Sequence, residues 1–545
     1  METANHEPVT IEKQITTLRK DTEERPKSYN YDEAIDLAGN GCYNIGLLVT
    51  LSITFFAMCL DLFSFAVVVA LASCDLQLSL VQKSILVSVP FTGPVLTAYA
   101  WGYFSDTRGR KKSLTIGMFV SFTMSILCTF SPNWIMMGVF KLVGTCFCSC
   151  AQSASYALLG ESCASRVKGP YMLVMTSTFH LGLPTYMSIA YAVFKLDFLY
   201  GLGYISFVPW RLLALILALP LGLASVLLHF FFESPKFVLN TGKEEQALEI
   251  LRKIHKRNGR SEEYPVQYLV LNEDGNVKRR EGPFLTSLWQ QTAPLFKPPL
   301  LRNTMILYCL VFIAFSISGS LNVWLPFIAN AFNEPALNHT NGLCALVELT
   351  SSISSEPTTC TSSASTVELP LVLTSIATGG FFTTINIIMA RFASRRKASL
   401  IMIYAFAAIC GIMTTLIPSN VAGIFYFGML ATSLCTGPLF AYFVDLVPTS
   451  FRGMAACLGV MVTRISSVSG INLVGPFITS HCSVTFYCLS ALALNVKNNA
   501  GKGKLIKDNR EQKEKGVWAS NIRHDSIRRG IVGGKIEMKE NHRRI

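Results

Sequence analysis

Three charged residues lie inside long apolar stretches of this sequence: Asp61, Lys141 and Arg464. At the centre of a bilayer, each would cost at least about 2.5 to 3.5 kcal/mol unless it were paired or hydrated. A carboxylate and an ammonium group inside the same helix bundle can neutralise each other. A carboxylate in a cavity can also take up and release a proton. These three residues are therefore candidates for a pathway that carries a solute or a proton.

His180, in the fifth apolar stretch, is a further candidate for moving protons. Its imidazole titrates near neutral pH, but a lone histidine on an apolar helix is more often an ordinary core residue. No paired metal ligands, ATP-binding loop or nucleophile elbow occurs in the sequence. We therefore expect neither an enzyme, nor a metal site, nor a cofactor, so a gradient would have to supply the energy for any pumping.

The composition indicates what must position these residues. Of the 545 residues, 51% are hydrophobic and only 15% are charged, whereas a typical soluble domain has about 25% charged residues. Apolar segments long enough to span a bilayer, about 20 residues each, lie at 46–73, 84–103, 113–130, 134–160, 170–194, 210–232, 303–332, 369–390, 398–417, 421–443 and 454–479. A twelfth begins near Ser483 and stops being apolar at Leu494. We expect an all-α polytopic membrane protein whose twelfth span is truncated or atypical, either natively or through an alternative ending.

The distribution of charge predicts the orientation and argues against nucleic acid as a partner. Much of the net charge of +13 comes from the tail 495–545, which has 14 Lys/Arg against 6 Asp/Glu. In the connections, Lys and Arg concentrate on one side, with 12 of them between the sixth and seventh spans. By the positive-inside rule this side, with the N-terminus, is cytoplasmic.

The connection between the seventh and eighth spans then lies on the exterior or lumenal side. It contains the sequon at Asn338, and also Cys344 and Cys360. Glycosylation and disulfide formation are both permitted there. A glycan on Asn338 and a bridge from Cys344 to Cys360 are therefore expected, with an unmodified loop as the alternative.

Internal similarity divides the chain into two related halves. Gly-Arg-Lys-Lys at 109–112 returns as Ser-Arg-Arg-Lys at 394–397, and Glu161 is matched by Asp445 at nearly the same offset. Such a parallel duplication gives two six-span bundles. The predicted parts are a cytoplasmic N-terminal segment (1–45), a first bundle (46–232), a cytoplasmic linker (233–302) with an amphipathic helix over 244–257, a second bundle (303–494) and a basic polar tail (495–545).

The stretch Gly-Tyr-Phe-Ser-Asp-Thr-Arg-Gly-Arg-Lys at 102–111 resembles the G-x-x-x-D-[RK]-x-G-[RK]-[RK] signature of the major facilitator superfamily, with one departure at Thr107. Segments 233–236, 448–453 and 458–461 resemble the sugar-porter-related branch that contains the synaptic vesicle glycoprotein 2 family. This resemblance implies the major facilitator fold, in which two six-helix bundles surround a central cavity.

The resemblance also implies roles for individual residues. A cytoplasmic latch that holds the two halves together is expected from Gly102, Asp106, Arg108, Gly109, Arg110 and Lys111, with Arg452 at the start of span eleven. Spans one and four line the cavity in this family, which would place Asp61 and Lys141 on it together. Trp324 resembles a span-seven tryptophan that lines a ligand pocket, with an interfacial belt residue as the alternative.

These features together predict a secondary-active transporter of a small organic solute, proton-coupled through Asp61 and working by alternating access. Lys141 and Arg464 against Asp61 would leave the cavity positive, which favours an anionic or polyhydroxylated solute. The alternative is a non-transporting protein of vesicle membranes that keeps the fold and acts in binding or trafficking. Ser64 favours this alternative, because related proteins often have a second acid there. The expected location is the plasma membrane or a secretory vesicle membrane.

Overall fold

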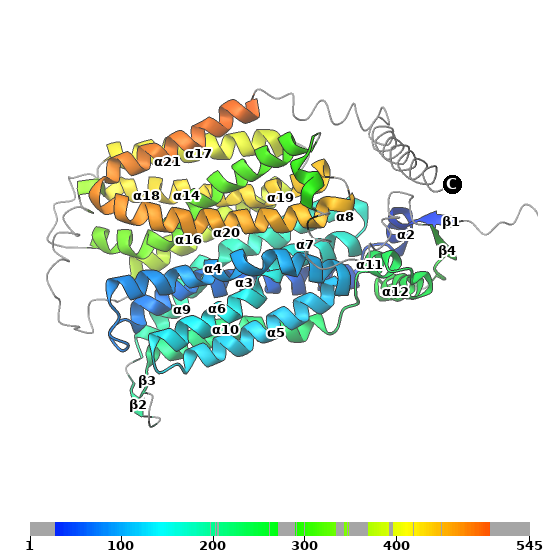
Figure 1. Ribbon diagram of the computed structural model, residues 1–545, viewed down its shortest axis with the longest axis horizontal. Helices are drawn as coiled ribbons and strands as arrows, with labels where there is room; N and C mark the ends of the chain where they lie inside the picture. Colours follow the sequence, from blue (N-terminus) through cyan, green and yellow to red (C-terminus); the bar gives the residue numbers. More distant parts are fainter. Residues whose placement is uncertain are drawn as a thin grey trace, which may run out of the picture.

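The fold is known from a computed structural model, which describes residues 28–196, 198–201, 203, 206–260, 262–270, 289, 292–298, 300–333, 343–345, 347, 369–391, 396–417, 419–447 and 449–501. Long helices run side by side in two groups, with the first half of the chain in blue to teal below the second half in green to orange (Figure 1). The all-α prediction is confirmed. Within the described residues, ten helices are long and apolar enough to cross a membrane.

The helices of the first half follow the predicted spans closely. They are α3 (Cys42–Ala72), α4 (Leu80–Arg108), α5 (Arg110–Thr129), α6 (Trp134–Cys148), α7 (Cys150–Ser162), α8 (Ser165–Ser177), η1 (Thr178–Leu181), α9 (Gly182–Phe194) and α10 (Pro209–Leu228). A short hairpin of β2 (Tyr200–Gly201) and β3 (Ser206–Phe207) precedes α10.

The second half repeats this plan. Its elements are η3 (Ala293–Phe296), α14 (Leu301–Asn333), α16 (Leu369–Arg391), α17 (Arg396–Leu416), α18 (Ser419–Met429), η5 (Leu430–Cys435), α19 (Thr436–Leu446), α20 (Thr449–Ser480) and α21 (Cys482–Gly501). The last helix has 20 residues, but its apolar part covers only Cys482–Asn495. It packs along α17 within the second bundle, so an atypical twelfth helix is present.

Two of the expected spans contain a 3₁₀ segment at their middles. The fifth is α8 and α9 joined by η1, and the tenth is α18 and α19 joined by η5. A proline follows each break, Pro184 in α9 and Pro438 in α19. Because proline has no N–H, it cannot donate to the carbonyl four residues earlier. The carbonyls concerned belong to His180 and Leu434, which lie inside the two breaks.

A small layer of secondary structure covers one end of the bundles, which we call the linker end (Figure 1). It contains β1 (Ser28–Asn30), α2 (Tyr31–Ala38), α11 (Pro235–Asn240), α12 (Glu244–Arg257) and β4 (Tyr268–Val270). Strand β1 pairs in parallel with β4, and α2 packs on α12. The helix α12 has the bounds expected from its charge order, but nothing in the sequence pointed to the pairing of β1 with the linker.

Tyr31 attaches this layer to the first bundle. Its hydroxyl donates a hydrogen bond to the backbone carbonyl of Glu161 at the end of α7. Burial, reinforced by the negative charge of Glu161, raises the pKa of Tyr31 well above its ordinary value. The hydroxyl therefore stays protonated and remains a donor at every physiological pH.

One prediction about the opposite end of the molecule is wrong. Cys344 forms a disulfide with Cys482, the first residue of α21, and not with Cys360. Proximity along the sequence favoured Cys360, but the fold brings the start of α21 to the end of the bundle where Cys344 lies. Cys360 and Asn338 are outside the described residues, as are residues 502–545 of the tail.

The disulfide yields a direct prediction. Digestion without a reducing agent should release a cross-linked peptide pair that contains Cys344 and Cys482, detectable by mass spectrometry. Because the bond joins residues 138 positions apart, Cys482→Ser should cost about 2 to 4 kcal/mol and lower the temperature of thermal unfolding. Cys360→Ser is the matched control and should change neither result. A peptide pair of Cys344 with Cys360 would contradict the fold at this end.

Candidate functional site

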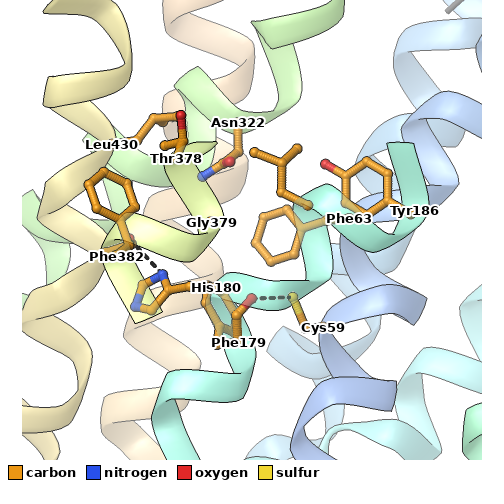
Figure 2. A pocket seen from close by; sticks show the side chains of 12 residues that line it. Cys59, Phe63, Phe179, His180, Tyr186, Asn322, Thr378, Gly379, Phe382 and Leu430 are labelled. Carbon is orange, nitrogen blue, oxygen red and sulfur yellow. Dashed lines mark hydrogen bonds between the residues drawn. The ribbon is translucent and has the colours of Figure 1, made fainter. Parts of the chain in front are cut away.

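A cavity lies between the two halves, where the interrupted helices meet (Figure 2). We call it the central cavity. It is lined from the first half by α3, η1 and α9, and from the second half by α14, α16 and η5. Its volume of about 40 Å³ is enough for roughly two or three water molecules. Because a solute needs more room, the two halves are closed around the site in this state.

The lining of the central cavity is aromatic and uncharged. Four aromatic rings and several neutral polar groups face it, namely Phe63, Phe179, Tyr186 and Phe382 with Cys59, His180, Asn322, Thr378 and Ser433. Interrupted helices commonly line the binding site of a transporter. This makes the central cavity the candidate solute site, and the described residues that line it carry no fixed charge.

His180 joins the two halves at this cavity. Its Nδ1 lies 3.4 Å from the hydroxyl of Ser433, so η1 and η5 are in contact through one hydrogen bond (Figure 2). The ring also packs edge-on against Phe382 of α16. His180 is thus both a buried residue and a lining residue, and the contact it makes would have to break for the halves to separate here.

Asp61 and Lys141 form a buried ion pair. The Lys141 Nζ lies 2.6 Å from Asp61 Oδ1, and the same oxygen accepts a hydrogen bond of 3.1 Å from the Ser125 hydroxyl. The ammonium group also lies 4.9 Å from the centre of the Phe65 ring. Among the described residues, Asp61 Oδ2 is enclosed without a hydrogen-bond partner.

The pair does not lie on the central cavity, so that expectation is corrected. It lines a separate cavity of about 30 Å³ inside the first bundle, between α3, α5, α6 and α10. The reason is the helical repeat of α3: Asp61 and Phe63 are two residues apart and therefore face opposite directions. Knowing that a span lines the cavity does not show which face of its helix points into that cavity.

Trp324 also lies away from the central cavity. Its Nε1 donates a 3.2 Å hydrogen bond to the carbonyl of Ile471, and its ring packs against Gly475 of α20. The residue of α14 that lines the cavity is Asn322, two positions earlier. In this conformation Trp324 holds α14 to α20 within the second bundle.

Arg464 lies in the middle of α20, at the contact between the halves. It is only 3% exposed, and its Nη2 donates a 3.1 Å hydrogen bond to Gln152 Oε1 of α7 in the first half. Among the described residues, no carboxylate lies within 4 Å of it. Its pairing therefore differs from that of Lys141.

A second cluster of charges occupies the linker end of the first bundle. Arg110 lies 2.9 Å from Asp106 of α4 and 3.1 Å from Glu161 of α7. Its guanidinium group also lies 5.1 Å from the ring centre of Phe237 in α11. One arginine therefore connects two transmembrane helices and the first helix of the linker.

Glu233 completes this cluster. Its carboxylate accepts hydrogen bonds from the backbone N–H groups of Lys111 and Lys112, at 2.8 and 3.2 Å. These donors form the N-terminus of α5, where a negative charge is favoured by the helix dipole. Gly109, with φ +114°, lies directly against this carboxylate, and any larger residue would displace it. In the sequence, Glu161 stood out as part of the internal repeat, and Glu233 as part of a segment with the family resemblance. Neither was predicted to belong to this charged cluster.

Comparison with known proteins identifies the architecture. The profile of the Major Facilitator Superfamily matches residues 51–471. The chain belongs to this superfamily. Two structures of the xylose transporter XylE, a proton:xylose symporter, match with TM-scores of 0.61 and 0.58, each at 15% identity and over 85% of this chain. They cover 96% and 100% of XylE and support the fold alone.

Among known sequences, the chain is similar to a putative transporter, to synaptic vesicle glycoproteins and to an organic cation/carnitine transporter. It is 26% identical over 310 residues to the putative transporter svop-1 of Caenorhabditis elegans, covering 56% of this chain and 55% of that protein. It is 26% identical over 321 residues to mouse synaptic vesicle glycoprotein 2C, covering 58% and 42%. Organic cation/carnitine transporter 7 of Arabidopsis thaliana is 29% identical over 231 residues, covering 42% and 44%. The chain thus spans about half the length of these relatives.

The residues of the superfamily signature make only some of the contacts that were expected of them. Its ion pairs, between Arg110 and the two acids, lie within the first half. The contact with α20 is made by Gly102, where an added Cβ would lie 2.6 Å from the Cys457 sulfur. Arg108 is exposed, and Lys111 Nζ donates to the His229 carbonyl. The Arg452 side chain and the second-half copy at 394–395 lie outside the described part, so a latch through Arg452 stays a prediction.

Arg110 and Arg108 provide a matched pair for testing the cluster. Arg110→Gln leaves Asp106 and Glu161 without their cation, and should cost about 1 to 3 kcal/mol. We expect a clearly lower temperature of thermal unfolding for purified protein. Arg108→Gln, two residues away at an exposed position, should unfold at the wild-type temperature. Equal effects of the two substitutions would show that the cluster contributes nothing specific.

Gly102 provides a test of the contact between the halves. A valine there cannot fit against Cys457, so Gly102→Val should part α4 from α20. Cys457, buried in the wild type, should then react with a water-soluble maleimide, measured on its peptide by mass spectrometry. The control is Gly169→Val, because nothing lies within 4 Å of an added Cβ at Gly169. Unchanged protection of Cys457 in Gly102→Val would refute the proposed close approach.

Proposed function

We propose that this protein is a secondary-active transporter of a small organic solute, coupled to protons through Asp61 and working by alternating access at the central cavity. Members of the superfamily are transporters and not, in general, enzymes. The observation that carries the proposal is the position of Asp61 on α3. One face of this helix carries the buried ion pair, and the other contributes Cys59 and Phe63 to the central cavity.

The coupling step would be protonation of the Asp61 carboxylate. While Asp61 is charged, it holds Lys141 of α6 and Ser125 of α5. A proton on Asp61 removes the attraction for Lys141, whose own charge is then left without a partner in an apolar interior. The free energy is then lowest when α3 moves and water hydrates the Lys141 ammonium group. Such a movement of α3 would be transmitted to Phe63 and so to the solute.

Alternating access requires the contacts between the halves to open on one side at a time. The main contacts run along α4 with α20 and along α8 and α9 with α16. At the second contact, an added Cβ on Gly379 would lie 2.8 Å from the His180 carbonyl, so the helices touch by their backbones. Backbone contact leaves few side chains to rearrange, which suits surfaces that must part and close again.

The linker end is proposed to be cytoplasmic. Two observations support this orientation. The Cys344–Cys482 disulfide lies at the opposite end, and disulfides form in oxidising compartments. The Lys and Arg residues of the connections concentrate at the linker end, in agreement with the positive-inside rule. The protein would then lie in the plasma membrane or in a secretory vesicle membrane, and the sequon at Asn338 would face the exterior or the lumen.

A second candidate function is binding or trafficking in a vesicle membrane without transport. The short apolar part of α21 favours it, and so does the similarity to synaptic vesicle glycoprotein 2C. The titratable, incompletely bonded Asp61 argues against it, because a scaffold has no need of such a group in its interior.

The decisive experiment is solute uptake by proteoliposomes with an inward proton gradient, supplied with a mixed metabolite pool and read by mass spectrometry. The wild type should accumulate one class of solute, and collapsing the gradient should abolish accumulation. Asp61→Asn should lose gradient-dependent accumulation, because an amide cannot exchange the proton. Solute exchange without a gradient should survive, since the central cavity is intact.

Two further variants make this experiment conclusive. Asp61→Asn leaves Lys141 buried and unpaired, so Asp61→Asn/Lys141→Met serves as the variant that restores folding. Asp75→Asn is the matched carboxylate control, because Asp75 also pairs with a cation, Arg211, but lies in the turn after α3 and lines neither cavity. Full accumulation by folded Asp61→Asn would refute the coupling role. No accumulation by folded wild type would favour the binding and trafficking function.

A further inference from the structure

We infer that Arg464 and Gln152 form the binding site for the anionic group of a small organic anion, whose apolar body occupies the central cavity. This inference rests on the proposed function and narrows its solute class. It begins from the pairing of the buried cations. Within the described residues, three cationic side chains of Lys and Arg are buried: Lys141, Arg211 and Arg464.

Two of these cations have a carboxylate beside them. Lys141 lies 2.6 Å from Asp61, and Arg211 lies 3.7 Å from Asp75. Arg211 also donates to the backbone carbonyls of Thr129 and Ser131, at 2.7 and 3.0 Å. Arg464, at 3% exposure, has no carboxylate within 4 Å among the described residues. Its positive charge is therefore the one that the described part of the chain leaves uncompensated.

The hydrogen bonds of Arg464 are also incomplete. A guanidinium group has five N–H donors in a planar fork that matches a carboxylate. The described residues supply one acceptor, Gln152 Oε1, and the Nε is enclosed without any. A buried cation with unused donors carries a large penalty, which an anion would remove. Gln152 has an amide NH₂ group that can donate to the same anion.

The position of this pair relates it to the central cavity. Arg464 lies in the middle of α20 and Gln152 in α7, so the pair bridges the two halves. Both helices of the pair pack on helices that line the central cavity: α20 packs along α14, which contributes Asn322, and α7 packs on α3, which contributes Cys59 and Phe63. Arg464 and Gln152 are not themselves among the residues that line the cavity in this closed state. When the halves part, an anion held by Arg464 would direct its remaining atoms toward the central cavity.

This arrangement selects a particular kind of solute. The rings provide an apolar surface for a flat or hydrocarbon body, and the cavity lining has no carboxylate to repel a negative group. Among the described residues, Arg464 is the buried cation without an acid at the contact between the halves, because Asp61 neutralises Lys141 inside the first bundle.

Benzoate is a suitable probe, and benzamide is its neutral counterpart of the same shape. Radiolabelled benzoate should bind saturably to the purified full-length protein in nanodiscs, without a proton gradient. Unlabelled benzoate should compete, whereas equal concentrations of benzamide should not. Arg464→Gln should weaken benzoate binding by at least about tenfold, since it removes a charge-assisted, two-point contact. Arg464→Lys should recover only part of the affinity, because a lysine lacks the planar fork.

Arg211→Gln is the matched control, because Arg211 is equally buried but already paired; it should keep benzoate affinity. Thermal unfolding guards against misfolded variants: Arg464→Gln should unfold at or above the wild-type temperature, since it removes an uncompensated charge. Equal competition by benzamide would overturn the inference in favour of a neutral solute. Complete competition by chloride at millimolar concentration would overturn it in favour of an inorganic anion. Absence of benzoate binding to folded wild type would overturn it as well.

These outcomes are separate from those of the uptake experiment. If benzoate does not bind but another solute is accumulated in an Asp61-dependent manner, the transport function stands and the anion site is refuted. If benzoate binds through Arg464 but no gradient drives uptake, the anion site stands and proton-coupled transport is refuted.

Discussion

The cost of placing a charge in an apolar interior governs this structure. A buried ion must find a partner, and each partner it finds ties two elements together. Lys141 ties α6 to α3 through Asp61, and Arg110 ties α4 and α5 to α7 through Asp106 and Glu161. Helices that share apolar surfaces of similar shape could slide along one another in a bilayer. The ion pairs remove that freedom within the first bundle and join its helices into one unit.

Contacts between the two bundles are of a different kind. They are made by small residues, such as Gly102 against Cys457, and by individual hydrogen bonds, such as those between His180 and Ser433 and from Thr383 to the Ser177 carbonyl. Strong ion pairs are found within the first half, and the described contacts across the halves are weak and apolar or lightly polar. This contrast suits a molecule in which rigid units separate and rejoin. Arg464 is the exception. It places a buried positive charge, with no acid beside it among the described residues, at the contact between the halves. The stability of the closed state therefore depends on what compensates this charge.

The linker end adds a structural connection that the membrane-spanning helices lack by themselves. Tyr31 joins the N-terminal segment to the end of α7, and Glu233 joins the linker to the start of α5. The strand pair β1–β4 then closes the N-terminal segment onto the linker. The residues before α3 and after α10 are therefore attached to the same end of the first bundle.

Much of the architecture was determined by the sequence itself. The length and apolarity of the spans, the internal repeat and the signature at 102–111 were enough for the fold, because a bilayer permits few solutions to the backbone hydrogen-bonding problem. The types of the buried charges also identified Asp61, Lys141 and Arg464 as unusual. What the sequence could not determine was the direction in which each side chain points and which distant segment it meets. The helical repeat turned Asp61 away from the central cavity, the packing of α21 gave Cys344 a partner 138 residues away, and the fold paired Arg464 with Gln152 of the other half. Such pairings depend on angles and distances between helices, which only the tertiary structure decides.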